Sequence, residues 1–158
     1  MKITKDYEGI ERLENGVYLI KGDLISDEDI EIELDDCLRV EKRIESKKSI
    51  KVLETLIAGC DIKAGYNIKA GCDIAAGGGI EAGYGIEAGG GIKAGLKIVA
   101  KWISARLRIF AGIFLYREVT EEEMTITVEE VKSGTIAYGI LNIVKPKEEV
   151  KETKKMKK

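Results

Sequence analysis

The chain has 158 residues, of which 44% are hydrophobic, 34% charged and only 6% aromatic, and its formal net charge is −2. This length suits one domain with small additions at its ends, and the charge excludes a global field that attracts nucleic acid or an anionic membrane. The sequence contains no histidine, which excludes every histidine-dependent catalytic triad and the commonest metal ligand.

The three cysteines indicate a reducing compartment. They are an odd number at irregular spacing without a Cys-x-x-Cys pair, which argues against a disulfide framework. The first residues lack the apolar stretch of a signal peptide, and no run reaches the length of a transmembrane helix. We therefore expect a cytoplasmic protein that does not bind a membrane.

Residues 1–31 are expected to form an N-terminal cap. Asn15-Gly16 separates the segments 8–13 and 17–21, and this dipeptide is a strong indicator of a β-hairpin. A hairpin here would cover strand edges that the repeat described below would otherwise expose.

Acidic residues occupy alternate positions near the end of this segment: Asp27, Asp29, Glu31, Glu33 and Asp35. An extended strand would place all five carboxylates on one face. One interpretation is a solvated edge whose like charges prevent association between sheets. The other is an anionic patch that imitates a phosphate backbone or docks a basic partner.

Residues 32–118 contain a six-residue repeat, most clearly written Ile-x-Ala-Gly-x-x. Aliphatic residues recur at Ile32, Leu38, Ile44, Ile50, Leu56, Ile62, Ile68, Ile74, Ile80, Ile86, Ile92 and Ile98. Alanine follows two residues later from Ala58 to Ala100, and glycine comes next at most of these positions. The aliphatic residue and the alanine would face inward from a short strand, and the glycine would supply a positive φ at a corner.

Three strands and three corners would close one triangular coil of roughly 18 residues, with neighbouring coils about 4.8 Å apart. An α-helix does not keep a six-residue period on one face. Stacking of such coils places Lys63 on Glu81, Lys69 on Glu87 and Tyr66 on Tyr84. We expect about five coils, ending near Leu115.

A basic and aromatic segment follows a one-residue slip of the repeat after Ile98. Ile103 and Ile109 resume the six-residue spacing, and Trp102, Arg106 and Arg108 lie in this segment. Phase slips bend a strand and redirect its side chains. Two interpretations remain open here: a contact surface, for which this composition is typical, and ordinary packing at the end of the rod.

Residues 119–146 are expected to form a C-terminal β-hairpin cap that turns at Lys132-Ser133-Gly134. Thr120 precedes three glutamates, which favours a short helical turn. Residues 147–158 are rich in lysine and glutamate and form a charged tail.

The repeat offers no catalytic or cofactor site. The glycine triplets 77–79 and 89–91 keep the phase of the repeat and lack the context of a phosphate-binding loop. Cys60 and Cys72 have no evident base nearby, so we interpret them as inert thiols. We expect no catalytic residue, no cofactor and no metal.

The Ile-x-Ala-Gly-x-x units resemble hexapeptide-repeat β-helices and the triangular solenoids of bactofilins. The resemblance, which covers the central repeat, implies an all-β parallel β-helix, to which the residues at the two ends add a hairpin cap each. In hexapeptide repeats the small residue usually precedes the aliphatic residue, whereas Ala64 follows Ile62, so the handedness of the coil stays open. The acyltransferases that resemble this core use a catalytic histidine, which this chain lacks.

The sequence favours a non-enzymatic structural or protein-interaction solenoid that docks on another macromolecule as a monomer or small closed oligomer. Self-association is a further possibility, and direct binding to nucleic acid is not expected. The alternative is an inhibitor of a nucleic-acid-handling protein, of the phage anti-defence or gyrase-inhibitor kind. Such an inhibitor would use the acidic residues as a DNA-mimicking face.

Overall fold

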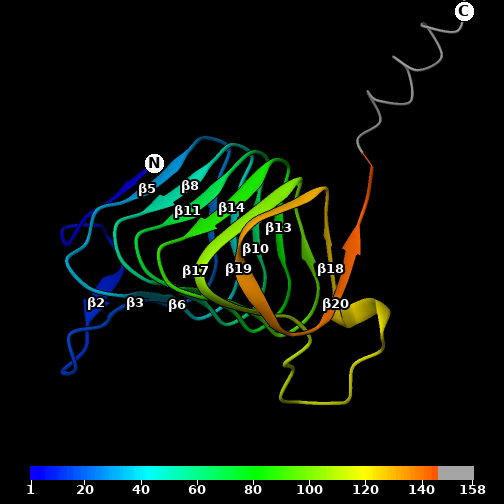
Figure 1. Ribbon diagram of the computed structural model, residues 1–158. Helices are drawn as coiled ribbons and strands as arrows, with labels where there is room; N and C mark the ends of the chain where they lie inside the picture. The colour runs from blue at the N-terminus through cyan, green and yellow to red at the C-terminus, as the bar shows by residue number, and fades with distance from the viewer. Residues whose placement is uncertain (146–158) are drawn as a thin grey trace, which may run out of the picture.

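The computed structural model describes residues 1–145 as a rod of stacked triangular coils (Figure 1). The charged tail predicted over 147–158 lies outside these residues. The rod has about seven turns, more than the five expected, because segments before residue 32 and after residue 118 join the same stacks. The all-β parallel solenoid is confirmed.

Three faces run along the rod, and we number them 1 to 3. Face 1 contains β1 (Lys2–Ile3), β5 (Ile30–Ile32), β8 (Ile50–Val52), β11 (Ile68–Ala70), β14 (Gly85–Ala88), the first part of β17 (Trp102–Phe110) and that of β19 (Glu130–Tyr138). Face 2 contains β2 (Ile10–Arg12), β3 (Tyr18–Ile20), β6 (Leu38–Val40), β9 (Leu56–Ala58), β12 (Ile74–Ala76), β15 (Ile92–Ala94) and the ends of β17 and β19. Face 3 contains β4 (Leu24–Ser26), β7 (Ile44–Ser46), β10 (Ile62–Ala64), β13 (Ile80–Ala82), β16 (Ile98–Val99), β18 (Thr125–Val128) and β20 (Ile140–Ile143).

The core consists of columns of stacked, mostly aliphatic side chains. In the central coils the first and third residues of a strand are buried and the second faces outward, as in β10, where Lys63 is exposed between Ile62 and Ala64. The parallel register places Ile62 on Ile80 and Ala64 on Ala82. Burial of these apolar side chains is the main favourable contribution to folding. The predicted cross-coil pairs also form, with Lys63 at 3.9 Å from Glu81 and Lys69 at 3.8 Å from Glu87.

The glycines of the repeat are required for a reason that differs from the expected one. Positive φ is found at Gly16, Gly112 and a few other glycines, and at none of the repeat glycines from Gly59 to Gly95 that follow an alanine. A β-carbon on Gly83 would instead lie well under 3 Å from the carbonyl oxygen of Gly65, one coil earlier. The other repeat glycines from Gly59 to Gly95 that follow an alanine show the same close approach to the backbone of the preceding coil.

The N-terminal hairpin is confirmed, since β2 pairs antiparallel with β3. The parallel stacks nevertheless begin before residue 32, because β3, β4 and β5 pair with β6, β7 and β8. The strand that was expected to start at Ile32 starts at Ile30, which lies on Ile50. The corner after β5 is two residues longer than the later corners, and both Ile30 and Ile32 are buried, which explains the error in phase.

The phase slip after Ile98 is confirmed, because Ile103 lies on Ile86 and Ile109 on Ile92, so this coil is shorter by one residue than those before it. Leu115 does not continue the repeat. It lies in a loop over residues 112–121 that projects from the rod (Figure 1). The short helical turn predicted after Thr120 is present as η1 (Glu122–Met124).

The C-terminal hairpin prediction is wrong. β19 continues through Lys132-Ser133-Gly134 and pairs parallel with β17, and β20 pairs parallel with β18. Gly134 has φ 108° on a strand whose register with β17 is irregular, so it marks a bend of the chain around the rod rather than a reversal. Residues 125–143 therefore form a further coil.

Among residues 1–145 no helix has the length and apolar character needed to cross a bilayer.

We predict that Gly83→Ala destabilises the rod by about 3 kcal/mol, because the added methyl group overlaps a backbone carbonyl that cannot move without shifting a coil. Gly79→Ala is the matched control, since its nearest backbone atom would lie at 3.1 Å. Thermal and urea unfolding followed by circular dichroism measure both. Equal stability of the two variants would contradict this explanation.

Candidate interaction surfaces

The five acidic candidates do not lie on one strand. Only Ile30–Ile32 is extended in β5, and Asp27 and Asp29 precede it at one corner, whereas Glu33 and Asp35 follow it at the next. The side chains from Asp29 to Asp35 do alternate between exposed and buried positions as expected. The carboxylates therefore wrap around two corners of the rod instead of forming a flat face.

Basic side chains accompany most of these carboxylates. Lys47 lies 3.2 Å from Asp27 and Lys2 lies 3.5 Å from Glu33. Glu31 stands between Lys2 and Lys51 in the parallel register. This pairing reduces the negative potential on which a DNA-mimicking inhibitor would depend.

Asp35 belongs to a separate contact with the N-terminal hairpin. The Tyr18 hydroxyl donates a hydrogen bond of 2.7 Å to its carboxylate, and Arg12 lies 3.9 Å away. The hydrogen bond, and after it the nearby guanidinium, lowers the pKa of Asp35. Asp35 thus helps to hold the hairpin to the first coil.

Trp102 and the two arginine candidates lie on different parts of β17. The Trp102 ring packs over Gly85, where a β-carbon would overlap the indole, and the Lys132 ammonium lies 4.2 Å from the ring centroid. Arg106 and Arg108 flank the exposed Leu107 where β17 rounds the corner between faces 1 and 2. The arginines line a shallow hollow with Phe110, and Trp102 is not part of it.

Face 2 differs from the other faces in its outward residues. Faces 1 and 3 carry cross-coil pairs of opposite charge. Between β3 and β17, face 2 carries no outward carboxylate on its strands, and its outward residues are Leu19, Arg39, Ile57, Ala75, Lys93 and Phe110. These residues recur once per coil in the sequence, but their shared character was not predicted.

The loop over residues 112–121 is held by its own contacts. Phe114 and Tyr116 meet edge to face at a centroid distance of 5.5 Å, and the Arg117 guanidinium lies 5.2 Å from the Phe114 centroid. Arg117 also donates two hydrogen bonds to the Glu123 carboxylate, one of 2.9 Å. These bonds, together with one from the Thr120 amide, lower the pKa of Glu123 to about 2.

The loop and face 2 enclose a groove that we call the face-2 groove. Ile57, Ala75 and the backbone of Gly59 and Gly77 form its floor, whereas Ile113, Leu115 and Tyr116 form its wall. Arg39 and Lys93 also line it. Leu115 and Tyr116 are each 87% exposed, so the wall stands open to solvent.

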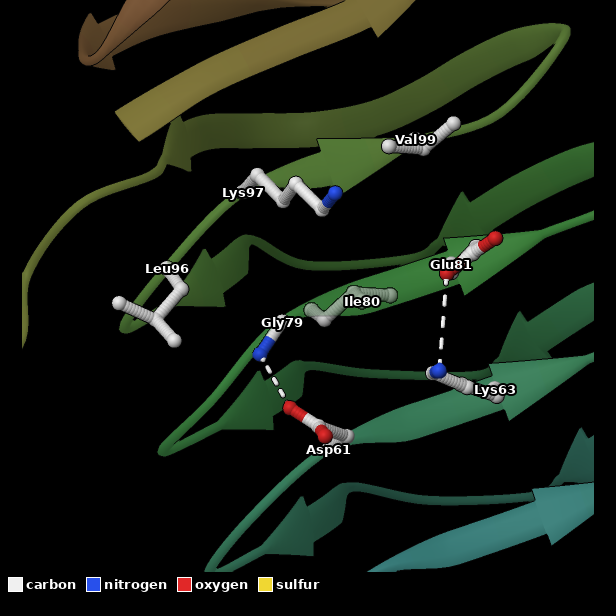
Figure 2. Close-up of a pocket in the computed structure, with 8 residues that line it drawn as sticks. All are labelled: Asp61, Lys63, Gly79, Ile80, Glu81, Leu96, Lys97 and Val99. Atoms are coloured by element: carbon white, nitrogen blue, oxygen red, sulfur yellow. Dashed lines mark hydrogen bonds and ion pairs between the residues drawn. The ribbon is translucent and has the colours of Figure 1, made fainter. Parts of the chain in front are cut away.

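A second hollow lies on face 3, where Figure 2 shows the residues that line it. The Asp61 carboxylate accepts a hydrogen bond of 2.8 Å from the Gly79 amide of the next coil, and Lys63 pairs with Glu81. Asp73 and Asn67 accept equivalent bonds from Gly91 and Gly85. The Asp61, Asp73 and Asn67 side chains therefore hold one corner to the next, a role that was not predicted from the sequence.

Cys37 and Cys72 are poorly suited to act as nucleophiles. Burial raises the pKa of Cys37, and a hydrogen bond of 3.5 Å to Glu54 raises the pKa of Cys72. A thiol with a raised pKa is poorly ionised at neutral pH. All three cysteines are free, and no group of three potential metal ligands occurs within the described part of the chain.

Comparisons with protein-family models, with curated protein sequences and with solved structures give no match for this chain.

We predict that Asp61→Ala destabilises the rod by about 1–2 kcal/mol, because it leaves the Gly79 amide without its acceptor. Asp61→Asn keeps an acceptor oxygen at the same place and is expected to lose less than half as much. Thermal unfolding of both variants measures the difference. If Asp61→Asn lost as much stability as Asp61→Ala, the charge of Asp61, and not its hydrogen bond to Gly79, would be the cause of the stabilisation.

The contact between Arg117 and Glu123, which we call the loop clamp, has a defined pH dependence. The pKa of Glu123 is lowered, so its contribution is fully present above its usual value of 4.5 and is lost as the pH falls toward about 2. Arg117→Gln removes the main cause and is expected to raise the pKa toward 4.5. A carboxyl titration by NMR checks this, with Arg106→Gln as control. An unchanged midpoint in Arg117→Gln would contradict the clamp.

Proposed function

We propose that this chain is a non-enzymatic protein-interaction solenoid that docks on another protein through its C-terminal coil, as a monomer or small closed oligomer. The observation that carries this proposal is the exposed apolar surface of that coil. Ile140, Leu141 and Ile143 of β20 are 40%, 42% and 53% exposed. Among residues 1–145, β20 pairs only with β18, so its outer edge is available to another strand.

The opposite end of the rod supports a closed assembly rather than an open polymer. β2 folds antiparallel over β3 on face 2, and β1 covers β5 on face 1 (Figure 1). Head-to-tail growth requires two complementary ends, and on face 2 of this end the antiparallel β2 interrupts the parallel stack that such growth would continue. Two ends of different construction favour a single docking event over open polymerisation.

The non-enzymatic part rests on the side chains available. The chain has no histidine, and the polar groups of the face-3 hollow are engaged in contacts between coils. The resemblance to hexapeptide repeats and bactofilins remains one of fold, so we propose neither acyl transfer nor filament formation. The free cysteines suit the cytoplasm, where we place the protein.

The docking proposal predicts a position-specific crosslink. A photoreactive p-benzoylphenylalanine at position 141 is expected to crosslink one protein partner in cells, because Leu141 lies on the exposed β20. The same group at position 25 is the matched control, since Ile25 is 44% exposed on β4 at the other end. The photoreactive group at position 143, also on β20, is expected to crosslink the same partner. Adding Leu141→Lys to that chain should abolish the crosslink from position 143.

Light scattering on the purified chain complements this experiment. We expect a monomer or a dimer whose mass does not grow with concentration. Equal crosslinking from positions 25 and 141, or long assemblies in solution, would overturn the proposal.

A further inference from the structure

We infer that the face-2 groove binds an extended, acidic segment of a partner protein that carries an apolar anchor residue. This inference goes beyond the proposed docking of the C-terminal coil, because it uses a different surface. It starts from the shape of the groove. Gly59 and Gly77 lack side chains, and Ile57 and Ala75 form a low apolar floor, so a peptide backbone can approach the sheet closely.

Contacts within the loop hold the wall of the groove in place. The Phe114–Tyr116 contact and the Arg117–Glu123 clamp fix the segment that presents Leu115 and Tyr116. A prearranged surface loses less conformational entropy on binding than a flexible loop. Exposed aromatic and aliphatic side chains held in this manner are typical of residues that dominate the energy of an interface.

The charges of the groove define the chemistry of its ligand. Arg39 and Lys93 are exposed, and neither forms an ion pair with any other residue between 1 and 145. Arg106 and Arg108 lie at the edge of the same face, beside Phe110. Carboxylates are therefore the complementary groups, as opposite charges across an interface provide specificity and speed association.

The spacing of the two cations limits the conformation of the ligand. Arg39 lies on β6 and Lys93 on β15, three strands away, which corresponds to about 14 Å at the interstrand spacing. Four residues of extended chain also span about 14 Å, and residues i, i+2 and i+4 then point the same way. The pattern acidic-x-apolar-x-acidic places carboxylates at both cations and an apolar side chain against Ile57 and Ala75.

Other occupants fit the surface less well. An anionic membrane would be repelled by Glu118, Glu121 and Glu122, which are exposed on the same projecting segment. A second copy would have to offer carboxylates, and those near its N-terminus are mostly paired with Lys2, Lys47 and Arg12.

A random twelve-residue peptide library displayed on phage tests the inference, selected on the full chain at low salt. We expect enrichment of acidic-x-apolar-x-acidic sequences. An enriched peptide, synthesised with a fluorescent label, is expected to bind at least about tenfold more weakly to Arg39→Glu/Lys93→Glu by fluorescence anisotropy. Lys51→Glu/Lys63→Glu, with the same charge change on faces 1 and 3, should bind as the unaltered chain does.

A second variant tests the wall separately. Leu115→Ser changes one side chain that is 87% exposed, keeps the Phe114–Tyr116 contact, and is expected to keep its unfolding temperature while losing peptide affinity by a similar factor. Leu141→Lys should leave peptide binding unchanged, which separates this inference from the docking of the C-terminal coil.

Several results would overturn the inference. One is a selection that enriches no sequence, or only sequences that lack carboxylates. Another is an equal loss of peptide binding in Lys51→Glu/Lys63→Glu. Binding of the chain to anionic lipid vesicles, or dimerisation that depends on Leu115, would assign the groove to another occupant.

Discussion

Each coil of this rod lies directly on the coil before it, and from Gly59 to Gly95 the backbone contact at one position of each corner leaves no space for a β-carbon. That contact explains the glycines that follow the alanines, which have ordinary φ values but face a carbonyl oxygen of the preceding coil. It also fixes the register, since a coil that cannot shift along the rod must place isoleucine on isoleucine and alanine on alanine. The stacked Tyr66 and Tyr84 rings, 5.5 Å apart, follow from the same register.

The period of the sequence predicted the central coils because the strand pattern and the contacts between coils repeat there every six and every 18 residues. The inward Ile62 and Ala64, the outward Lys63 and its partner Glu81 all follow from the hexapeptide period and from the stacking of one coil on the next. The last coil was missed because a loop interrupts the period. Ile126 lies on Ile98, and Leu141 in turn lies on Ile126, at sequence spacings that differ from the spacing of the earlier coils. The role of Asp61 was missed because its partner is an amide of the next coil.

The surfaces could be predicted only in part. Arg39, Ile57, Ala75 and Lys93 share one face and recur once per coil, so their proximity was available from the period. Their use as a groove depends on the loop that carries Leu115 and Tyr116, whose return toward face 2 has no repeat to reveal it. In contrast, the acidic residues that stood out in the sequence are mostly matched by lysine and arginine side chains brought from other coils.

The most direct test of the stacking is a disulfide between neighbouring coils. Cys60 donates its backbone amide to the Lys42 carbonyl at 3.0 Å, and both residues are exposed at the corner position that Tyr66 and Tyr84 occupy elsewhere. Stacked residues about 4.8 Å apart lie within the Cα range of a disulfide. With Cys37 and Cys72 replaced by serine, Lys42→Cys should oxidise to an intramolecular disulfide with Cys60, whereas Lys48→Cys, at the next corner, should not. Failure of the first pair, or equal oxidation of the second, would contradict the stacking of coil on coil.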